Sequence, residues 1–312
     1  MQHEEFIKAI DQWRSEIKSL HVRDGHTAIL PGSAASGISK GCEACKAGTW
    51  YCLFIGSRCN LTCSFCARGH ETAKLSFDPM KAAGGKHLGS MVSDAEVLAE
   101  LGRSSYLNGF SFSGGEPWMY LSRVKTLSKE ISTQFPKMYQ WLYTNGTMVD
   151  AKRAEELHKC GIQEIRFDTA ATDFSPNVME RIALARKIFP IVTIETPVLP
   201  GSEDALLASL DVAAEIGIDH VNLHDLKITE DLRMEPPKRE EICENPEMPA
   251  IHTWTTSTKA VYHVMKEAAL RGYPMSIHDC TYPNVVNQQK KFITNATGHK
   301  FAEENQGKAS AK

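Results

Sequence analysis

The feature that most constrains the fold is a regular alternation of short β-rich runs and helical segments. The β-rich runs are TWYCLFIGS, GFSFSG, QWLYTNG, EIRFDTA, IVTIETPV and HVNLHDLKI. Amphipathic helical patterns separate these runs, and several of them follow capping residues such as Ser93, Asp150 and Ser202. Strands that alternate with helices form a parallel sheet with the helices outside it. Because right-handed crossovers curve such a sheet, six βα units predict an α/β fold with an open, partial (β/α)6 barrel of the TIM type.

The segments that flank the six units divide the chain into four predicted parts. These are 1–48, an N-terminal helix and a cysteine-containing segment; 49–228, the barrel; 229–300, a C-terminal extension with helices that closes the barrel; and 301–312, a disordered tail. Within the first part we expect a helix over residues 4–20 and a loop over 23–48. Within the third part, 229–256 is rich in Pro and Glu and is predicted to be an irregular insertion.

Bulk composition gives no reason to expect a nucleic acid or a membrane as partner. The net charge is −3 and 42% of the residues are hydrophobic, so neither a polyanion nor an unfolded chain is indicated. No run of about 18 apolar residues is present, and we therefore predict no membrane span. The start MQHEEFIKAIDQW lacks a basic segment followed by an apolar one, so we expect no signal peptide and a cytoplasmic location.

The cysteines are unusually concentrated for a chain of this kind. Six of the nine lie between residues 42 and 66, and in a reducing compartment such a group favours metal binding over disulfides. The stretch CNLTCSFC places Cys59, Cys63 and Cys66 after the first predicted strand, at the end where barrel active sites are built. Four thiolates complete a [4Fe–4S] cubane, so three leave one iron without a protein ligand. Zinc takes four ligands and rarely has this spacing.

The CxxxCxxC spacing, the turn SGGEP after the second strand and TNG after the third resemble the radical S-adenosylmethionine (radical SAM) superfamily. The resemblance covers residues from about 40 to 285. It implies a [4Fe–4S] cluster whose open iron binds SAM, and an electron donor such as flavodoxin or ferredoxin. It also implies cleavage of SAM to a 5′-deoxyadenosyl radical that abstracts a hydrogen atom. Short phrases such as GCxxC, VNLHDL and HDC are distantly similar to relatives of pyruvate formate-lyase-activating enzymes, but the tight cysteine run of true activases is missing, so that activity is not carried over.

The resemblance also implies which residues contact SAM. An aromatic residue lies beside the adenine, glycines let the backbone approach the methionine group, and a glutamate accepts its ammonium. The residues at these positions, with the polar residues that follow or line the next strands, are Phe65, Ser113, Gly114, Gly115, Glu116, Asn145, Arg166 and Asp168. By strand alternation Arg166 and Asp168 share the interior face, although a structural ion pair is the alternative reading.

Polar residues on the later strands are the candidates for substrate contact. Glu195, Asn222 and His224 fall on interior faces by the same alternation, and Tyr143 is a candidate hydrogen-atom donor. These positions predict a small polar, amino-acid-like substrate more than a peptide. A radical SAM enzyme that modifies a peptide or protein is the first alternative. A non-enzymatic iron–sulfur or zinc protein is the second.

A second cysteine group lies in GCEACKAGTWYC, upstream of the triplet. A CxxC pair followed by a third thiol indicates a metal site in a reducing compartment. We predict an auxiliary [4Fe–4S] cluster, or alternatively Zn²⁺, bound by Cys42, Cys45, Cys52 and Cys280, with Cys243 as the other candidate for the fourth ligand. Because Cys52 lies near the start of the first strand, this site is expected at the far end of the barrel from the SAM cluster, and Cys280 can join it only if its strand runs antiparallel or ends low.

Overall fold

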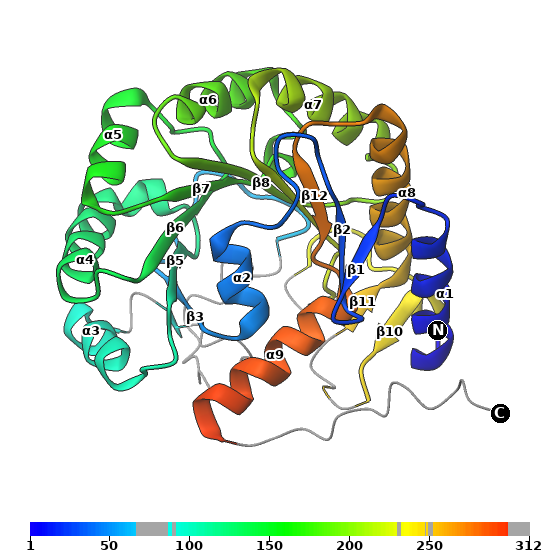
Figure 1. Cartoon of the computed structure of the whole chain (residues 1–312), viewed down its shortest axis with the longest axis horizontal. Helices are drawn as coiled ribbons and strands as arrows, with labels where there is room; N and C mark the ends of the chain where they lie inside the picture. The colour runs from blue at the N-terminus through cyan, green and yellow to red at the C-terminus, as the bar shows by residue number, and fades with distance from the viewer. Residues whose placement is uncertain (67–86, 89–91, 230–231, 247, 249–251, 299–312) are drawn as a thin grey trace.

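The fold is built around one curved sheet, with helices along its outer face and one helix inside the curve (Figure 1). The computed structural model describes residues 1–66, 87–88, 92–229, 232–246, 248 and 252–298. Within these residues the sheet has ten strands in the order β1-β2-β12-β9-β8-β7-β6-β5-β3-β4. Their bounds are β1 His21–Arg23, β2 Thr27–Leu30, β3 Trp50–Phe54, β4 His87–Leu88, β5 Gly109–Ser113, β6 Tyr139–Thr144, β7 Glu164–Phe167, β8 Ile191–Pro197, β9 His220–His224 and β12 Ser276–Asp279.

The predicted barrel is confirmed, and the sheet extends beyond it on both sides. The six predicted strands are β3 and β5 to β9, and they pair in parallel in the expected order. β4 adds in parallel to β3, and β12 adds in parallel to β9. The hairpin β1–β2 then joins β12 in antiparallel fashion, with Leu30 opposite Ile277. Because β1 and β4 are the two edges, the barrel is open.

The connecting helices cover the outer face of the sheet, where the predicted helical patterns lie (Figure 1). Their bounds are α3 Asp94–Arg103, α4 Leu121–Gln134, α5 Ala151–Cys160, α6 Pro176–Arg186, α7 Glu203–Ile216 and α8 Thr255–Arg271. Ser93 and Asp150 cap α3 and α5 by accepting hydrogen bonds from backbone N–H groups. Ser202 precedes α7, but its hydroxyl donates to the Leu199 carbonyl instead of capping the helix.

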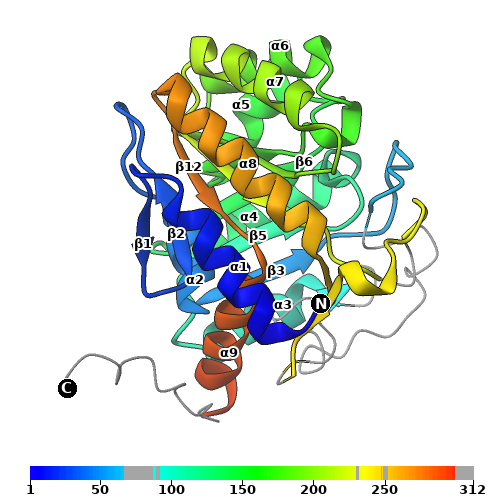
Figure 2. The same ribbon diagram turned by 90° about the vertical axis from the view of Figure 1, so that its right-hand side faces the viewer.

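The N-terminal part differs most from expectation. α1 (His3–Ser15) ends earlier than predicted and packs along α8, as Figure 2 shows. The predicted loop over residues 23–48 contains strand β2 and helix α2 (Lys40–Ala47). Helix α2 is too short for a hydrophobic period to be recognised in its sequence. Its ends are nevertheless marked, because Ser39 caps its start and Gly48, at φ +68°, ends it.

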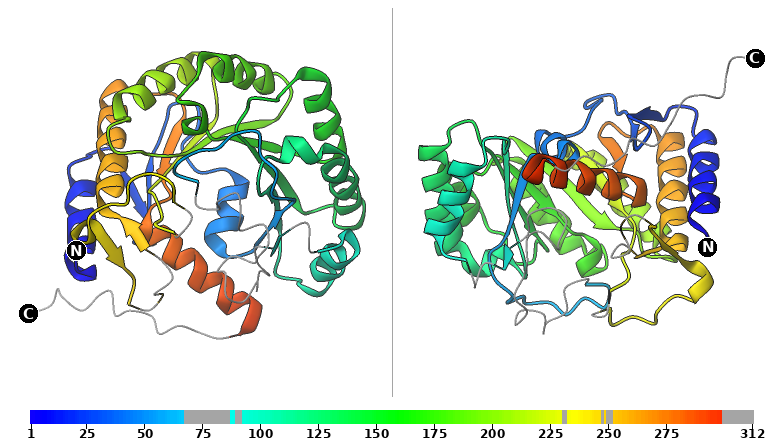
Figure 3. Two further views of the ribbon diagram at one scale, coloured as in Figure 1. Left: turned by 180° about the vertical axis from the view of Figure 1, so that it is seen from behind. Right: turned by 90° about the horizontal axis from the view of Figure 1, so that it is seen from below.

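Helix α2 lies inside the curve of the sheet, and α9 (Tyr282–Thr297) runs across the open side (Figure 3). The two helices contact each other. Side chains of α2 and of the facing strands form an inner apolar cluster of Ala44, Trp50, Cys52, Phe54 and Trp141, separate from the main core under the outer helices. The N-terminal segment is therefore an internal part of the barrel rather than an appendage.

The C-terminal extension is more regular than predicted. Its insertion includes a two-stranded antiparallel pair, β10 (Ile242–Glu244) and β11 (His252–Trp254). The predicted disordered tail, 301–312, lies outside the described residues. None of the helices in the described ranges combines the length and apolar character needed to cross a bilayer.

Candidate active site

The loop that follows β3 brings the three predicted cluster cysteines over the ends of β6 and β7. The Cys59 sulfur accepts a hydrogen bond from the Leu61 N–H at 3.4 Å. The Cys63 thiol lies 3.7 Å from the Ala171 carbonyl oxygen, just after β7. The Cys66 N–H donates to the Cys63 carbonyl at 3.2 Å, which closes a turn between the last two thiols. The loop is therefore at the carboxyl end of the strands, as the sequence predicts.

The thiols of this loop are held in a way that suits a metal cluster. Burial raises the pKa of Cys59, and burial together with the negative charge of Asp168 raises the pKa of Cys63 to about 12. Such thiols stay protonated at neutral pH unless a cation displaces the proton. All three side chains are only partly buried. Three soft donors on one loop fit an iron–sulfur cluster that has one free iron.

No three His, Cys, Asp or Glu side chains within the described ranges are gathered around a point where one metal ion would fit, and this includes the thiols of the loop. In a cubane each thiolate binds a different iron. The ligands of a cluster therefore stand farther apart than those of a single ion.

The glycines of SGGEP bring two backbone segments together. The Gly115 N–H donates to the Gly56 carbonyl and the Glu116 N–H to the Arg58 carbonyl, both at 2.8 Å. A Cβ at Gly115 would lie 2.1 Å from the Arg58 oxygen, and Gly114 has φ +125°. A side chain at either position would push the turn away from the cysteine loop. Their close neighbour in the structure is thus the chain itself, and the predicted approach to SAM stays a prediction.

Glu116 ties together the turn and the next strand end. Its carboxylate is 1% exposed and accepts hydrogen bonds from the Trp118 N–H, the Thr144 hydroxyl and the Asn145 N–H at 2.8–2.9 Å. Burial raises the pKa of Glu116, and these three donors oppose that shift. The carboxylate therefore has a structural role that sequence reasoning did not foresee. Its predicted contact with the SAM ammonium stays a prediction.

Asn145 connects the end of β6 to the cysteine loop. Its side-chain amide donates to the Asn60 oxygen at 2.9 Å and lies 3.8 Å from the Cys59 sulfur. The residue thus positions the Cys59 thiol, and its predicted part in the SAM pocket stays a prediction. Phe65 lies within the cysteine loop and Ser113 ends β5, and both are partly buried.

Asp168 is the predicted SAM residue whose charge acts on the cysteine loop. It follows β7 and accepts hydrogen bonds from the Thr196 hydroxyl at 3.1 Å and the Ala171 N–H at 3.3 Å. Burial raises the pKa of Asp168 to about 7 in spite of these donors. Its charge in turn acts on Cys63. A partly exposed carboxylate beside the loop can accept a hydroxyl from a ligand.

Arg166 faces the interior as predicted, but it lies one layer deeper than Asp168 and is 1% exposed. Its guanidinium donates to Glu164 at 2.7 Å, to Glu195 at 2.6 Å and to the Ser39 hydroxyl at 3.1 Å. It also lies over the Trp141 ring, with 4.9 Å between the guanidinium carbon and the ring centroid. The structure therefore contains the ion pair that was the alternative reading, and contact with SAM stays a prediction for Arg166.

The residues predicted to bind substrate are brought together, but two of them bond to the protein. Glu195 accepts from Arg166 and, at 2.9 Å, from the Asn222 amide. Burial opposes ionisation of Glu195, but the charges of Arg166 and His224 outweigh it and lower its pKa. Asn222 also donates to the Cys42 sulfur at 3.2 Å. His224 is partly buried at the end of β9 and acts on Glu195, and its predicted contact with substrate stays a prediction.

The second cysteine group is brought together by α2 and β12. The Lys46 ammonium lies 3.6 Å from the Cys280 sulfur. Burial, followed by the charge of Cys280, raises the pKa of Cys45 well above its ordinary value, so these thiols are near neighbours. β12 runs parallel to β9, and Lys46 of α2 lies next to Cys280, which follows the carboxyl end of β12. The group is therefore inside the barrel and not at its far end, contrary to our expectation. Lys46 was missed because a lysine beside CxxC carries no recognisable spacing signal.

Comparisons with known proteins agree with this geometry. A model of the Radical SAM superfamily matches residues 53–213. A Methanocaldococcus jannaschii protein with the provisional name glycyl-radical enzyme activating enzyme is 23% identical over 209 residues, which cover 65% of this chain and 54% of the relative.

Among solved structures, Streptococcus suis SuiB has a TM-score of 0.52 at 14% identity, covering 84% of this chain and 54% of its own. SuiB bound to its precursor peptide SuiA gives the same TM-score, covering 77% and 51%. The chain spans about half the length of these relatives, and the likeness to SuiB shows the fold alone. The family match covers more than half of the chain and includes the cysteine loop, so the protein belongs to the radical SAM superfamily and is an enzyme of that class.

Proposed function

We propose that this enzyme cleaves SAM reductively at a [4Fe–4S] cluster bound by Cys59, Cys63 and Cys66 and takes a hydrogen atom from a polypeptide. When bound, the cluster and SAM would supply the radical chemistry: one electron from a flavodoxin- or ferredoxin-type donor would split SAM into methionine and a 5′-deoxyadenosyl radical, which would become 5′-deoxyadenosine by taking a hydrogen atom from a substrate C–H bond. The observation that supports this most directly is the loop of three partly buried thiols beside Asn145 and Asp168.

The residues around the loop have separate tasks in this proposal. Asn145 and the Leu61 N–H orient the Cys59 sulfur. Asp168 accepts a hydroxyl of the SAM ribose, because it is the partly exposed carboxylate next to Cys63. Glu116 holds the turn of SGGEP against the loop, so the backbone there is rigid when SAM binds.

The contacts inside the barrel favour a polypeptide over a small polar molecule. The sequence predicted the latter because polar residues line the interior, but Arg166, Glu195 and Asn222 bond to one another and to the segment of α2. The C-terminal insertion packs on the cysteine loop, with the N–H groups of Arg233 and Met234 donating to the Ser64 carbonyl at 2.9 and 3.2 Å. The insertion is therefore a candidate docking segment for a polypeptide. The name of the M. jannaschii relative, an activator of another enzyme, points to the same class.

An auxiliary metal centre at Cys42, Cys45 and Cys280 is also part of the proposal. Cys52 is the fourth ligand expected from the sequence, and the centre is an iron–sulfur cluster or alternatively zinc. All nine cysteines are free. Free thiols in this number suit a reducing compartment such as the cytoplasm.

The test is anaerobic purification followed by metal analysis and turnover. With SAM and a strong reductant, the wild-type protein should form 5′-deoxyadenosine, and the Cys59→Ala/Cys63→Ala/Cys66→Ala variant should form none. About eight irons falling to about four in that variant means two clusters; about four falling to none, with zinc retained, makes the second site a zinc site. Absence of 5′-deoxyadenosine from an iron-loaded wild-type protein contradicts the proposal.

The substrate class is tested with two fractions of a cell extract from the source organism. One holds molecules above about 10 kDa and the other is the small-molecule filtrate, and each is added to the SAM cleavage assay. A polypeptide substrate predicts that only the large fraction raises 5′-deoxyadenosine formation, and that protease treatment removes the effect. Stimulation by the filtrate alone supports the second candidate, a small polar molecule that binds near His224.

A further inference from the structure

The side chain of His278 is buried without any visible reason. It is 1% exposed, and neither ring nitrogen has a hydrogen-bond partner in the parts of the chain that the structure describes. A neutral imidazole carries one donor and one acceptor, and leaving both unsatisfied in the interior costs about 1–3 kcal/mol for each group. Buried polar groups nearly always have a hydrogen-bond partner or bind an ion or water, so the nitrogens of His278, unpaired within the described residues, need an explanation, and a bound ion is one candidate.

His278 points to the inside of the barrel. It lies on β12, where Asp279 bonds outward to Arg14 of α1 and Ile277 belongs to the outer core. Because side chains alternate along a strand, His278 and Cys280 share the opposite, inner face. The inner face of β12 is the one covered by the segment before α2, since the Ser276 hydroxyl donates to the Gly37 carbonyl.

The neighbours of His278 on both sides are linked to α2. Its register partner on β9 is Asn222, whose amide is 3.2 Å from the Cys42 sulfur. Two residues further on, just after β12, is Cys280, whose sulfur is 3.6 Å from the Lys46 ammonium. His278 thus lies between two residues that contact the first and last residues of the turn Cys42 to Lys46, and Cys45 lies on that turn.

We propose that His278 is the fourth protein ligand of the auxiliary centre, together with Cys42, Cys45 and Cys280. The inference rests on the auxiliary centre of the proposed function but not on the SAM chemistry. Imidazole replaces thiolate on iron in some iron–sulfur clusters, where it raises the reduction potential. Three thiolates and one imidazole also bind zinc, but for a single ion these side chains would have to move closer together. In both cases the centre has mixed sulfur and nitrogen ligands, and the experiment below determines which metal it holds.

Asn222 completes the surroundings of this centre as a positioning residue. Its amide N–H points at the Cys42 sulfur, and its Oδ1 is buried and unpartnered within the described part of the chain. A ligating histidine normally donates its other N–H to an oxygen nearby. The Asn222 oxygen, in register with His278, is suited to accept it. Replacing Asn222 by Leu should shift the reduction potential of an iron centre, or weaken zinc binding tenfold or more, without removing a ligand.

Cys52, the ligand expected from the sequence, is the competing candidate. It lies on β3 within the inner apolar cluster that contains Trp50, Phe54 and Trp141, and Cys45 packs against the same cluster. Its register partner on β5 is Ser111. Cys52 therefore provides the matched control, because the two assignments make opposite predictions for Cys52→Ala and His278→Ala.

The experiment uses the Cys59→Ala/Cys63→Ala/Cys66→Ala protein, so that only the auxiliary centre contributes metal. In this background His278→Ala should lower the metal content at least tenfold, whereas Cys52→Ala should leave it unchanged. His278→Cys should retain metal and thereby show that the chain still folds. For iron, pulsed electron paramagnetic resonance of the reduced protein should show a directly bound nitrogen, lost in His278→Cys. For zinc, X-ray absorption should show a mixture of sulfur and nitrogen ligands.

Either metal supports the proposal if nitrogen ligation is present and depends on His278. All-sulfur ligation, or loss of metal in Cys52→Ala with retention in His278→Ala, overturns it. The result is independent of radical chemistry, because 5′-deoxyadenosine formation is measured on the protein with its cysteine triplet intact. Turnover with metal retained in His278→Ala refutes this inference alone, whereas nitrogen ligation without turnover refutes only the proposed function.

Discussion

At the scale of single residues, Asp225 shows how burial sets the charge of a group near the site. It follows β9 and is 1% exposed. One carboxylate oxygen accepts from the Thr258 hydroxyl at 2.8 Å and the Tyr282 N–H at 2.9 Å. The other is buried without a partner among the residues described. Burial raises the pKa of Asp225 to about 6, and the two donors oppose it. The protonated form is therefore the one that the fold prefers.

This preference predicts a pH-dependent stability. The folded-state pKa lies above the unfolded value, so the contribution of Asp225 is fully present below about pH 4 and is lost as pH rises through about 6. Asp225→Asn should therefore gain stability relative to wild type over this window, by on the order of 2–3 kcal/mol. The measurement is the difference in free energy of unfolding between the two proteins from pH 4 to pH 7.5.

Asp211 is the control with the opposite sign. The hydrogen bond from Tyr273 lowers the pKa of Asp211, so its contribution is present above the unfolded pKa and is lost as pH falls. Asp211→Asn should lose stability relative to wild type as pH rises towards neutrality. Equal pH profiles for the two variants would contradict the assignment of the effect to Asp225.

The alternation of side chains along strands predicted correctly which face each side chain is on, but not which residues it bonds to. Arg166, Asp168, Glu195 and Asn222 all face the interior as expected. Alternation fixes a face but not the depth along the strand, and it contains no information about α2, which supplies the partners of Arg166 and Asn222. Nothing in the sequence was a reason to single out His278. The residue stands out because its buried nitrogens have no hydrogen-bond partner among the described residues, and only a structure can show this.

At the scale of elements, α2 is held by close approach of its first turn to the barrel. A Cβ at Gly41 would lie 2.4 Å from a guanidinium nitrogen of Arg166 and 2.9 Å from a Glu164 oxygen. Ser39 at the cap bonds to both of these side chains as well as to the Cys42 N–H. The first turn of α2 therefore packs directly against the buried ion pair of Arg166 and Glu164. This close packing is possible because Gly41 has no side chain.

Gly41→Ala should therefore disrupt the packing of α2 against the sheet. We expect a loss of about 1–3 kcal/mol in the free energy of unfolding, since added atoms in a packed interior force neighbours to move. The matched control is Gly102→Ala in α3, where a Cβ would meet no described atom within 4 Å. That change should stabilise the protein by about 0.5–1 kcal/mol, because alanine favours the helix. Thermal unfolding of both variants checks the pair, and a Gly41→Ala protein as stable as Gly102→Ala would refute the clash.

The elements predicted correctly are those with a strong period and ordinary length. Each of the six barrel strands and its helix gave a clear signal, so their order and the open barrel could be predicted. β1, β2 and α2 have three, four and eight residues, too few for a period to show. Their positions depend on pairing with β12 and packing inside the sheet, which are contacts between distant parts of the chain.

At the scale of the whole molecule, a buried ion pair joins the N-terminal helix to the last strand of the barrel. Arg14 of α1 donates to Asp279 of β12 at 2.8 Å, to the Tyr262 hydroxyl at 2.9 Å and to the His26 carbonyl at 2.7 Å. The two charged side chains are 6% and 0% exposed. Asp279 also accepts from the Ala28 N–H, which lies in the N-terminal hairpin. One carboxylate thus fixes three parts of the chain.

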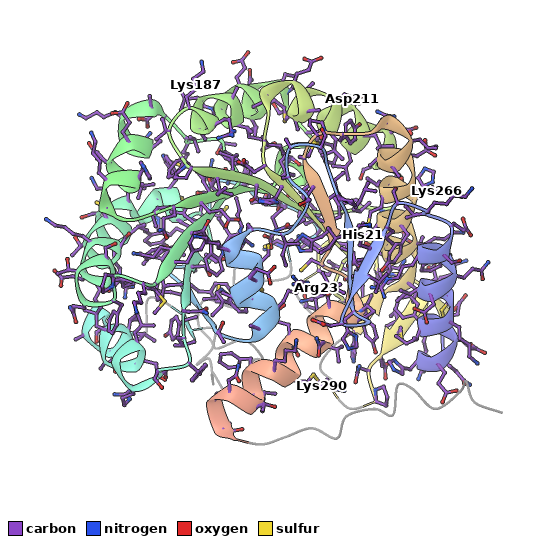
Figure 4. The ribbon with its side chains drawn as sticks, in the orientation of Figure 1. His21, Arg23, Lys187, Asp211, Lys266 and Lys290 are labelled. Carbon is purple, nitrogen blue, oxygen red and sulfur yellow. The ribbon has the colours of Figure 1, made fainter. Side chains whose placement is uncertain are left out.

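Removing the cation should be far more damaging than breaking a surface pair. Arg14→Met should cost about 3–5 kcal/mol, because it leaves Asp279 buried and unpaired. Lys266→Met is the control. Lys266 lies on the outside of α8 (Figure 4) and bonds to Glu16, just after α1; both side chains are well exposed, so its loss should cost no more than about 1 kcal/mol. Adding Asp279→Asn to Arg14→Met should recover part of the loss. Equal effects of the two single variants in chemical denaturation would rule out this explanation.

The pairing of β2 with β12 has a consequence for biosynthesis. Leu30 and Ile277 are neighbours in the sheet although more than 200 residues separate them. At about 5–20 residues per second, roughly 10–50 s pass on the ribosome between synthesis of Cys45 and of Cys280. Cys59, Cys63 and their neighbour Asn145 are complete much earlier. The thiols of α2 are therefore synthesised well before Cys280, and they have to stay reduced over that interval if they are to act together with it.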